Sequence, residues 1–288
     1  MRSTRPVSRQ RRSAAGFLAP FCLLFVCFYI VPIGYALIRS FYVTTREGAF
    51  GVATETFGGL DNYTRALEDS EFVRSIGRML LFGVVQVPVM LALALLFALL
   101  LDAGVTRFKS FFRLSFFAPY AVPSVIGAIM WGFLYAPSLS PIGVNLLGSD
   151  TILWSIANIV TWTYTGYNML ILFAALQAID RDLYEAARMD GASGWKIAWK
   201  IKIPLVRPAL VLTGVFSIIG TLQLFTEPQV LRSVTTSITS TYTPNLVAYT
   251  AASSNAFNYA AALSFLLAAA TGILSFALLR LTQRGAGP

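Results

Sequence analysis

The chain alternates between long apolar stretches and short polar ones. Runs without a charged residue extend over 13–38, 79–101, 114–149, 151–179, 208–226 and 233–279. Each run can hold the roughly 20 apolar residues with which a helix crosses a bilayer. The runs are continuous and not alternating, so they predict helices and not the strands of a membrane barrel. We therefore expect an all-α polytopic membrane protein with six transmembrane helices, near 16–38, 79–101, 112–135, 152–178, 208–227 and 256–279.

Composition and charge agree with this interpretation. The 288 residues are 56% hydrophobic and only 12% charged, whereas soluble proteins are about 25% charged. If the N-terminus is placed inside, 16 of the 22 Lys and Arg residues fall in inner segments, as expected for cytoplasmic loops. Both termini are then cytoplasmic, with a basic N-terminus at 1–15, one membrane domain at 16–280 and a tail at 281–288. The net charge of +9 is spread over separate segments, which argues against a nucleic-acid partner.

Several local features limit the possible chemistry. Pro88 in the second expected helix, and Pro119 and Pro123 in the third, predict kinks. The outer stretch 228–255 is rich in Ser, Thr and Asn and is either a lip over a cavity or a plain polar loop. The chain has no histidine, and its two cysteines fall within the first expected helix, so we expect no metal site. It also has no phosphate-binding loop motif, so any ATP must be held by another subunit.

The inner segment 180–207 is longer than a simple connection requires. Asp182 is expected to cap a short helix that contains Glu185, and Gly191 suits a left-handed turn at the end of this helix. A second, amphipathic helix is expected to start near Gly194 and to stop at Pro204. Such a rigid projection suits docking into a groove on a partner. The alternative is an amphipathic helix that lies flat on anionic lipid.

This segment resembles the EAA signature of binding-protein-dependent ABC importers. The signature reads E-A-A, three residues, G, nine residues, I, one residue, L-P; it is present here as Glu185-Ala186-Ala187, Gly191, Ile201 and Ile203-Pro204. The only departure is Ile in place of Leu before the proline. The stretches "LFAALQAIDRDLYEAARMDGAS", "GLDNYTRALEDSEF" and "FFRLSFFAPYAVPSVIGAIMWGFLY" are similar to the permeases of carbohydrate importers, the class that carries maltose, glycerol phosphate and multiple sugars. The resemblance extends from about residue 15 to 280.

The resemblance implies a permease subunit of an ATP-driven sugar importer in the cytoplasmic membrane of a prokaryote. It implies a second permease subunit, expected to form a heterodimer with this chain, two ABC ATPase subunits that hold ATP and Mg, and an extracytoplasmic solute-binding protein. The chain itself would supply half of the translocation path, hold no cofactor and catalyse no reaction. The residues that the resemblance assigns to ATPase coupling are Asp182, Glu185, Ala186, Ala187, Asp190, Gly191, Ile201 and Pro204.

Polar residues within the expected membrane helices are candidates for the substrate path. Tyr164, Tyr167 and Asn168 lie on the fourth expected helix, where aromatic, amide and hydroxyl groups suit a sugar. Gln223 and Glu227 lie four residues apart and are expected to share one face of the fifth helix. The alternative role for such residues is hydrogen bonding between helices.

Three alternatives stay open. Asn258, at the start of the sixth expected helix, is either a path residue or an interfacial anchor. An acid in the path disfavours phosphate or sulfate and favours a neutral sugar, but an importer of amino acids, peptides or anions has the same signature. A membrane-embedded enzyme would need clustered acids for a metal, and the inner acids have the spacing of helix caps instead.

Overall fold

A computed structural model describes residues 7–46, 53–104, 108–137 and 144–284. Parts of the expected N-terminal segment 1–15 and of the tail 281–288 lie outside these residues. Arg107, one of the 16 basic residues counted in inner segments, also lies outside them. The elements, in chain order, are α1 (Val7–Phe25), the π-helical turn η1 (Val26–Ile30), α2 (Val31–Ser40), β1 (Tyr42–Arg46), β2 (Ala53–Phe57), α3 (Asp61–Glu68), α4 (Ser70–Asp102), α5 (Lys109–Ala121), α6 (Ser124–Leu134), α7 (Ile152–Gln177), α8 (Arg181–Met189), α9 (Gly194–Ile197), the π-helical turn η2 (Ala198–Lys202), α10 (Ile203–Leu222), α11 (Thr226–Leu231), α12 (Pro244–Ser253) and α13 (Phe257–Arg284). The helical fold class is confirmed, with one short antiparallel hairpin added.

The number of membrane helices depends on one broken segment. Among the described residues, five helical segments are long and apolar enough to cross a bilayer: Ala15–Ser40, Ser70–Asp102, Ile152–Gln177, Gly194–Leu231 and Phe257–Arg280. The third expected helix, 112–135, is not one helix. It is the pair α5 and α6, which are bent by 94°. The count reaches six only when this pair is taken as one span.

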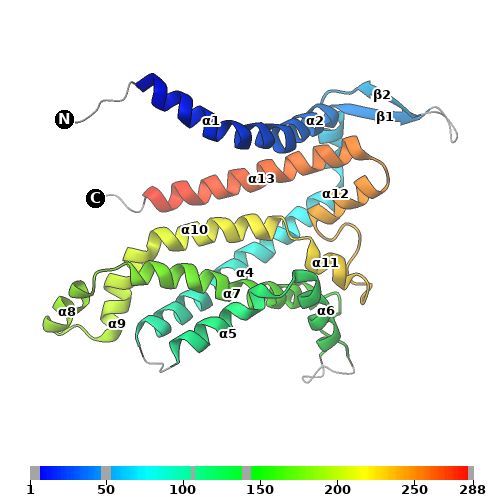
Figure 1. The fold of residues 1–288 in the computed structure, drawn as a ribbon. Helices are drawn as coiled ribbons and strands as arrows, with labels where there is room; N and C mark the ends of the chain where they lie inside the picture. Colours follow the sequence, from blue (N-terminus) through cyan, green and yellow to red (C-terminus); the bar gives the residue numbers. More distant parts are fainter. Residues whose placement is uncertain (1–6, 47–52, 105–107, 138–143, 285–288) are drawn as a thin grey trace.

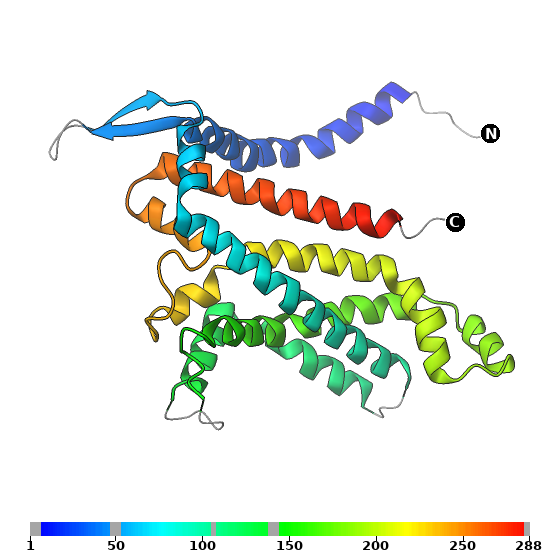
Figure 2. The ribbon, with the colours of Figure 1, turned by 180° about the vertical axis from the view of Figure 1, so that it is seen from behind.

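The long helices form a layered bundle (Figure 1). Helix α2 packs on α13, α13 on α10, α10 on α4, and α4 on α7, which in turn packs on α5. Helices α8 and α9 lie at the same end of the bundle as both ends of the described chain, whereas the β-hairpin, α6, α11 and α12 lie at the opposite end (Figures 1 and 2). We call these the inner and the outer end.

Two apolar clusters divide the bundle along its length. The outer cluster includes Phe82 of α4, Ile156 of α7 and Leu231 of α11. The inner cluster joins α4 and α7 again, together with α10, through residues such as Ala98 and Leu172. Between the two clusters, α4 and α7 carry buried polar residues instead: Gln86, Thr163, Thr165 and Asn168. The bundle therefore has a polar layer between two apolar ones.

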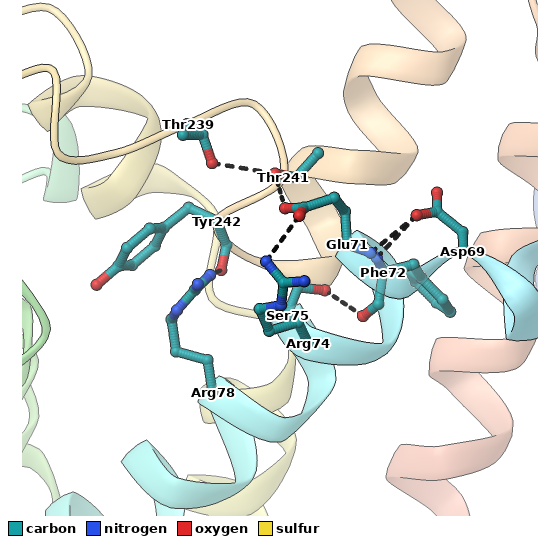
Figure 3. A network of polar contacts seen from close by, with 9 residues as sticks. All are labelled: Asp69, Glu71, Phe72, Arg74, Ser75, Arg78, Thr239, Thr241 and Tyr242. Atoms are coloured by element: carbon teal, nitrogen blue, oxygen red, sulfur yellow. Dashed lines mark hydrogen bonds and ion pairs between the residues drawn. The ribbon is translucent and has the colours of Figure 1, made fainter.

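The outer stretch 228–255 is an ordered cover and not an irregular loop. It contains α11 and α12, and its connecting segment is bound to the first turns of α4 (Figure 3). Thr241 donates a hydrogen bond to Glu71 at 3.0 Å, and Arg78 donates one to the carbonyl of Tyr242 at 2.6 Å. The hydroxyls of Thr235 and Ser237 both donate to the carbonyl of Leu147 at 2.8 Å. These contacts fix the cover across the outer ends of α4 and α7.

Helices α5 and α7 approach each other closely at Gly166, because this residue has no side chain. A Cβ atom built on Gly166 would lie 1.8 Å from the backbone oxygen of Phe116 in α5. We therefore expect Gly166→Ala to force the helices apart and to destabilise the fold by about 1–3 kcal/mol. Thermal unfolding of the purified protein in detergent measures this loss.

The matched control is Gly272→Ala in α13, where a Cβ atom meets nothing within 4 Å. Equal melting temperatures for the two variants would show that the close approach of α5 and α7 does not limit stability.

Candidate functional site

A polar cavity of about 360 Å³ lies within the polar layer. It falls within the range of small-molecule sites, about 300–1,000 Å³. Its walls come from α4, α7, α10 and the ends of α5, α6 and α11. The polar residues that line it are Gln86, Tyr120, Ser124, Tyr164, Tyr167, Asn168, Ser217, Thr221, Gln223, Thr226 and Glu227.

The break between α5 and α6 forms one wall of this cavity. Val122 precedes Pro123 and has an extended backbone, with ψ 128°. Proline disfavours the helical conformation in the residue before it, so the helix ends here and a new one begins at Ser124. Tyr120 and Ser124, one on each side of the break, both line the cavity.

A second break interrupts the fifth span. Helix α10 ends at Leu222 and α11 begins at Thr226, so the expectation that Gln223 and Glu227 share one helical face is wrong. The break nevertheless brings both residues to the cavity wall. The side-chain amide of Asn245 in α12 donates to the carbonyl of Gln223 at 2.7 Å, which satisfies a backbone group that the helix has released. Non-helical backbone at membrane depth is tolerated where it is buried in protein or lines a water-filled cavity.

Aromatic rings and an amide form a further part of the lining. Tyr120 stacks on Tyr167 with ring centroids 4.6 Å apart, and it meets the ring of Tyr164 edge-on at 5.8 Å. Asn168 is buried, and its amide donates to the carbonyl of Tyr164 at 3.1 Å. The expected path residues of α7 are thus brought together, and they offer flat apolar faces beside hydrogen-bonding groups.

Gln86 is a cavity residue that the sequence analysis did not single out. It is 2% exposed, and its amide nitrogen donates to Thr161 at 3.2 Å. Its carbonyl oxygen is buried and has no hydrogen-bond partner within the described residues. The available signal was that Gln86 is the one amide in the charge-free run 79–101, because polar residues inside membrane helices are commonly functional.

The cavity carries an acidic side chain. Glu227 is 5% exposed and lies at the first turn of α11. Among the described residues that line the cavity, none is Lys or Arg. An anionic ligand would therefore lose hydration here without gaining a cationic partner.

Asn258, for which both a path role and an anchoring role were left open, is not among the residues that line the cavity. Its amide donates to Thr44 and to Glu55 of the β-hairpin, each at 3.2 Å. Arg39 binds the same Glu55 carboxylate. The hydrogen bond from Arg39, supported by the one from Asn258, lowers the pKa of Glu55. Asn258 therefore anchors the hairpin to the outer end of α13.

A larger cavity of about 770 Å³ lies between α4, α10 and α13. Its lining is almost wholly apolar, with residues such as Leu91, Val211 and Leu278. Among its described lining residues only Thr221 and Thr282 are polar, whereas a site for a soluble ligand has several directed polar groups. We therefore place the candidate solute site in the smaller, polar cavity.

The inner segment forms the expected projection, with one change at its start. The cap of α8 is Asp180, whose carboxylate accepts from the backbone of Asp182 at 3.1 Å. Asp182 itself lies in the first turn, so the expectation that Asp182 is the cap is wrong. Asp180 immediately precedes the helix and is free to take the non-helical conformation that a cap needs.

Gly191 ends α8 as expected. Its φ is +76°, and the bonds from Gly191 to Arg188 and from Ala192 to Ala187 form a Schellman motif, each at 2.9 Å. Glu185, Ala186 and Asp190 are exposed and Ala187 is half-buried. These signature residues are therefore at the surface of the chain.

Pro204 does not stop the second helix of the projection. Ser193 caps α9, and the chain stays helical through η2 into α10. Ile201 lies within η2, and Pro204 lies in the first turn of α10. Proline has no N–H group to donate to the preceding turn, and its ring crowds the carbonyl group four residues earlier. The π-helical turn, in which Ile203 donates to Ala198, accommodates it without ending the helix.

Comparison with known proteins identifies the class of this bundle. Residues 70–285 match the family of binding-protein-dependent transport system inner membrane components. The chain belongs to this family and is a multi-pass membrane component of a transport system. The resemblance found in the signature residues is thereby confirmed.

Curated relatives and solved structures agree with this assignment. The chain is 33% identical to a lactose transport system permease protein (LacF) of Rhizobium radiobacter, over 90% of each chain. It is 33% identical to an sn-glycerol-3-phosphate transport system permease protein (UgpA) of Agrobacterium fabrum, over 71% of this chain and 73% of that one. A bacterial alginate ABC transporter, solved in complex with an alginate pentasaccharide-bound periplasmic protein, has a chain of the same fold, with a TM-score of 0.80 at 18% identity over 96% of both chains.

Substitution of Gln86 tests whether the polar layer serves transport or only holds the helices together. We expect Gln86→Leu to leave thermal stability unchanged or to raise it by up to about 1 kcal/mol, because it removes a buried oxygen that has no partner. Solute uptake by the assembled transporter should fall. Thermal unfolding and uptake, measured on the same preparation, test both statements.

Thr213→Val is the matched control. Thr213 is fully buried in α10, bonds only to carbonyls of its own helix within the described residues, and does not line the cavity. A loss of stability with full uptake in Gln86→Leu would mean that the polar layer merely holds the helices together.

Proposed function

We propose that this chain is the permease subunit of an ATP-driven sugar importer in the cytoplasmic membrane of a prokaryote. The observation that carries the proposal is the polar cavity, built where two helices break, in a chain that is 33% identical to a lactose permease along 90% of its length. Transporters place substrates near the bilayer midplane, where discontinuous helices end. Stacked tyrosines beside amide and hydroxyl groups suit the apolar faces and hydroxyls of a sugar.

The cavity favours a neutral sugar over an anionic solute. Glu227 is the acid at its wall, and none of the described lining residues supplies a positive charge. The relatives carry names that include both lactose and sn-glycerol 3-phosphate, so the choice between them rests on the charges of this cavity. The described acids offer no support for the alternative of a membrane enzyme, because no three metal-ligating side chains lie together among them.

Two subunits of this kind would enclose one path. The most apolar part of the segment Ala15–Ser40 is not buried within this chain, and the apolar cavity between α4, α10 and α13 is only partly enclosed. Both surfaces suit the helices of a second, similar permease, which we expect to complete the membrane domain as a heterodimer. An extracytoplasmic binding protein would deliver the sugar to the outer end.

Helix α8 would couple the permease to the ATPase. It projects from the inner end, exposes Glu185 and Ala186, and has rigid caps at both ends. A rigid helix seated in each of two ATPase subunits, which hold ATP and Mg, converts their closure into movement of the bundle. This chain would then need no nucleotide of its own.

The turn at Gly191 tests the coupling role. Gly191→Val places a branched side chain at φ +76°, a conformation that costs L-residues about 1–2 kcal/mol, so the correct turn should be disfavoured about 5- to 30-fold. We expect stimulation of the partner ATPase by the loaded binding protein to fall accordingly.

Two other variants are the controls for this test. Gly191→Asn, which tolerates the left-handed region, should retain more stimulation, and Gly194→Ala, where a Cβ atom meets nothing within 4 Å, should behave as the natural chain does. Full stimulation in Gly191→Val would argue against α8 as the coupling helix.

Substrate charge tests the transport role. Proteoliposomes that contain the complete transporter should take up a labelled neutral disaccharide in preference to labelled sn-glycerol 3-phosphate, because the phosphate gains no cationic partner in the cavity. Preferential uptake of the phosphate, or equal uptake of labelled amino acids, would overturn the assignment of a neutral sugar.

A further inference from the structure

A buried ion pair joins helices that are far apart in sequence at the inner end. Lys202 of η2 binds the carboxylate of Asp102, the last residue of α4, and the two side chains are 12% and 7% exposed. The second oxygen of Asp102 accepts from the side-chain amide of Gln177, the last residue of α7, at 2.7 Å. One carboxylate thus ties together the inner ends of α4 and α7 and the segment that leads into α10.

Tyr184 of α8 completes this cluster. The ammonium of Lys202 lies 4.9 Å from the centre of the Tyr184 ring, a distance at which a cation is attracted to an aromatic face. The hydroxyl of Tyr184 is buried and has no hydrogen-bond partner within the described residues. Burial, together with the nearby charge of Asp102, raises the pKa of Tyr184. The ring is therefore held by its face and not by its hydroxyl.

Helix α8 otherwise stands away from the bundle. None of its residues is buried, and in the part of the chain that the structure describes its backbone does not pack along another helix. The Tyr184 ring on Lys202 is a contact through which α8 can push on the bundle. We call Tyr184, Lys202, Asp102 and Gln177 the inner clasp.

The inner clasp and the cavity share two helices. Asp102 and Gln177 end α4 and α7, the helices that carry Gln86 and Asn168 into the polar layer. The inner apolar cluster, which includes Ala98, Leu172 and Val206, fills the space between clasp and cavity. Energetic coupling between sites travels through such contiguous packed and ion-paired groups.

We propose that the inner clasp positions α8 on the helices that line the cavity, and that it transmits movement of α8 to the solute site. Lys202 and Asp102 are positioning residues, since neither lines the cavity. The inference rests on the proposed coupling role of α8. A merely structural clasp would stabilise the inner end without affecting how the cavity responds to nucleotide.

The test uses the complete transporter in liposomes, with Cys22 and Cys27 replaced by alanine and Ser124→Cys as a reporter in the cavity. A membrane-impermeant thiol reagent labels the reporter with and without ATP, Mg and vanadate, and trapped nucleotide is measured in parallel. Tyr184→Leu and Lys202→Met should still trap nucleotide. In both variants the effect of trapping on the labelling rate should shrink by about 2- to 30-fold, the range found when a coupling network is broken.

Tyr184→Phe is the matched control, because it keeps the ring and removes only a hydroxyl that has no partner. In this variant, trapping should change the labelling rate of Ser124→Cys as much as it does in the reporter complex, the transporter that carries only the Ser124→Cys, Cys22→Ala and Cys27→Ala substitutions. If Lys202→Met fails to assemble because Asp102 is left uncompensated, the double variant Asp102→Asn with Lys202→Met removes both charges and decides the point.

The outcomes separate the inference from the proposed function. Normal trapping with an undiminished labelling response in Tyr184→Leu and in the variant without the ion pair would overturn the clasp and leave the coupling role of α8 intact. A reporter complex in which Glu185→Cys never crosslinks to the ATPase, and in which trapping leaves labelling unchanged, would overturn the coupling role itself.

Discussion

The structure depends on the need to satisfy backbone polar groups within a membrane. Hydrocarbon offers no hydrogen-bond partner, so a chain that crosses it remains helical unless protein or water takes the place of the lost bonds. Among the described residues, the chain leaves the helical conformation inside two of its candidate membrane segments, at 122–123 and at 223–225. Both breaks adjoin the same polar cavity, and Asn245 satisfies the released carbonyl of Gln223. Under the proposed function, the breaks are the places where water and solute would enter the bundle.

The arrangement of packing around the cavity supports this interpretation. Apolar clusters on either side of the polar layer hold α4 and α7 together. The acid Glu227 and the unpaired oxygen of Gln86 lie in that layer. A chain under selection for stability alone would gain by replacing such groups with apolar ones. Their presence is the kind of local inconsistency that marks functional sites.

Much of this organisation could be predicted from the sequence, because hydropathy and charge act over long, continuous runs. The helical class and the left-handed turn at Gly191 follow from local rules, and α7 could be identified as the polar helix. The two breaks could not be predicted in the same way. Pro123 signals a kink, but the size of the bend, 94°, depends on how α5 and α6 pack against α7. No proline lies between Pro208 and Pro228 to signal the break at Gln223. The anchoring role of Asn258 and the ion pair between Asp102 and Lys202 join residues at least 100 positions apart, which no local pattern reveals.

Backbone hydrogen exchange tests most directly whether the break in the fifth span borders a water-filled cavity. The account predicts that, in the assembled transporter in lipid nanodiscs, amides of Gln223–Glu227 exchange rapidly because they border a wet cavity. Amides of α4 beside the inner cluster should stay protected, as in packed membrane helices. If the break residues are as protected as the helices that flank them, the cavity is dry and the solute path lies elsewhere.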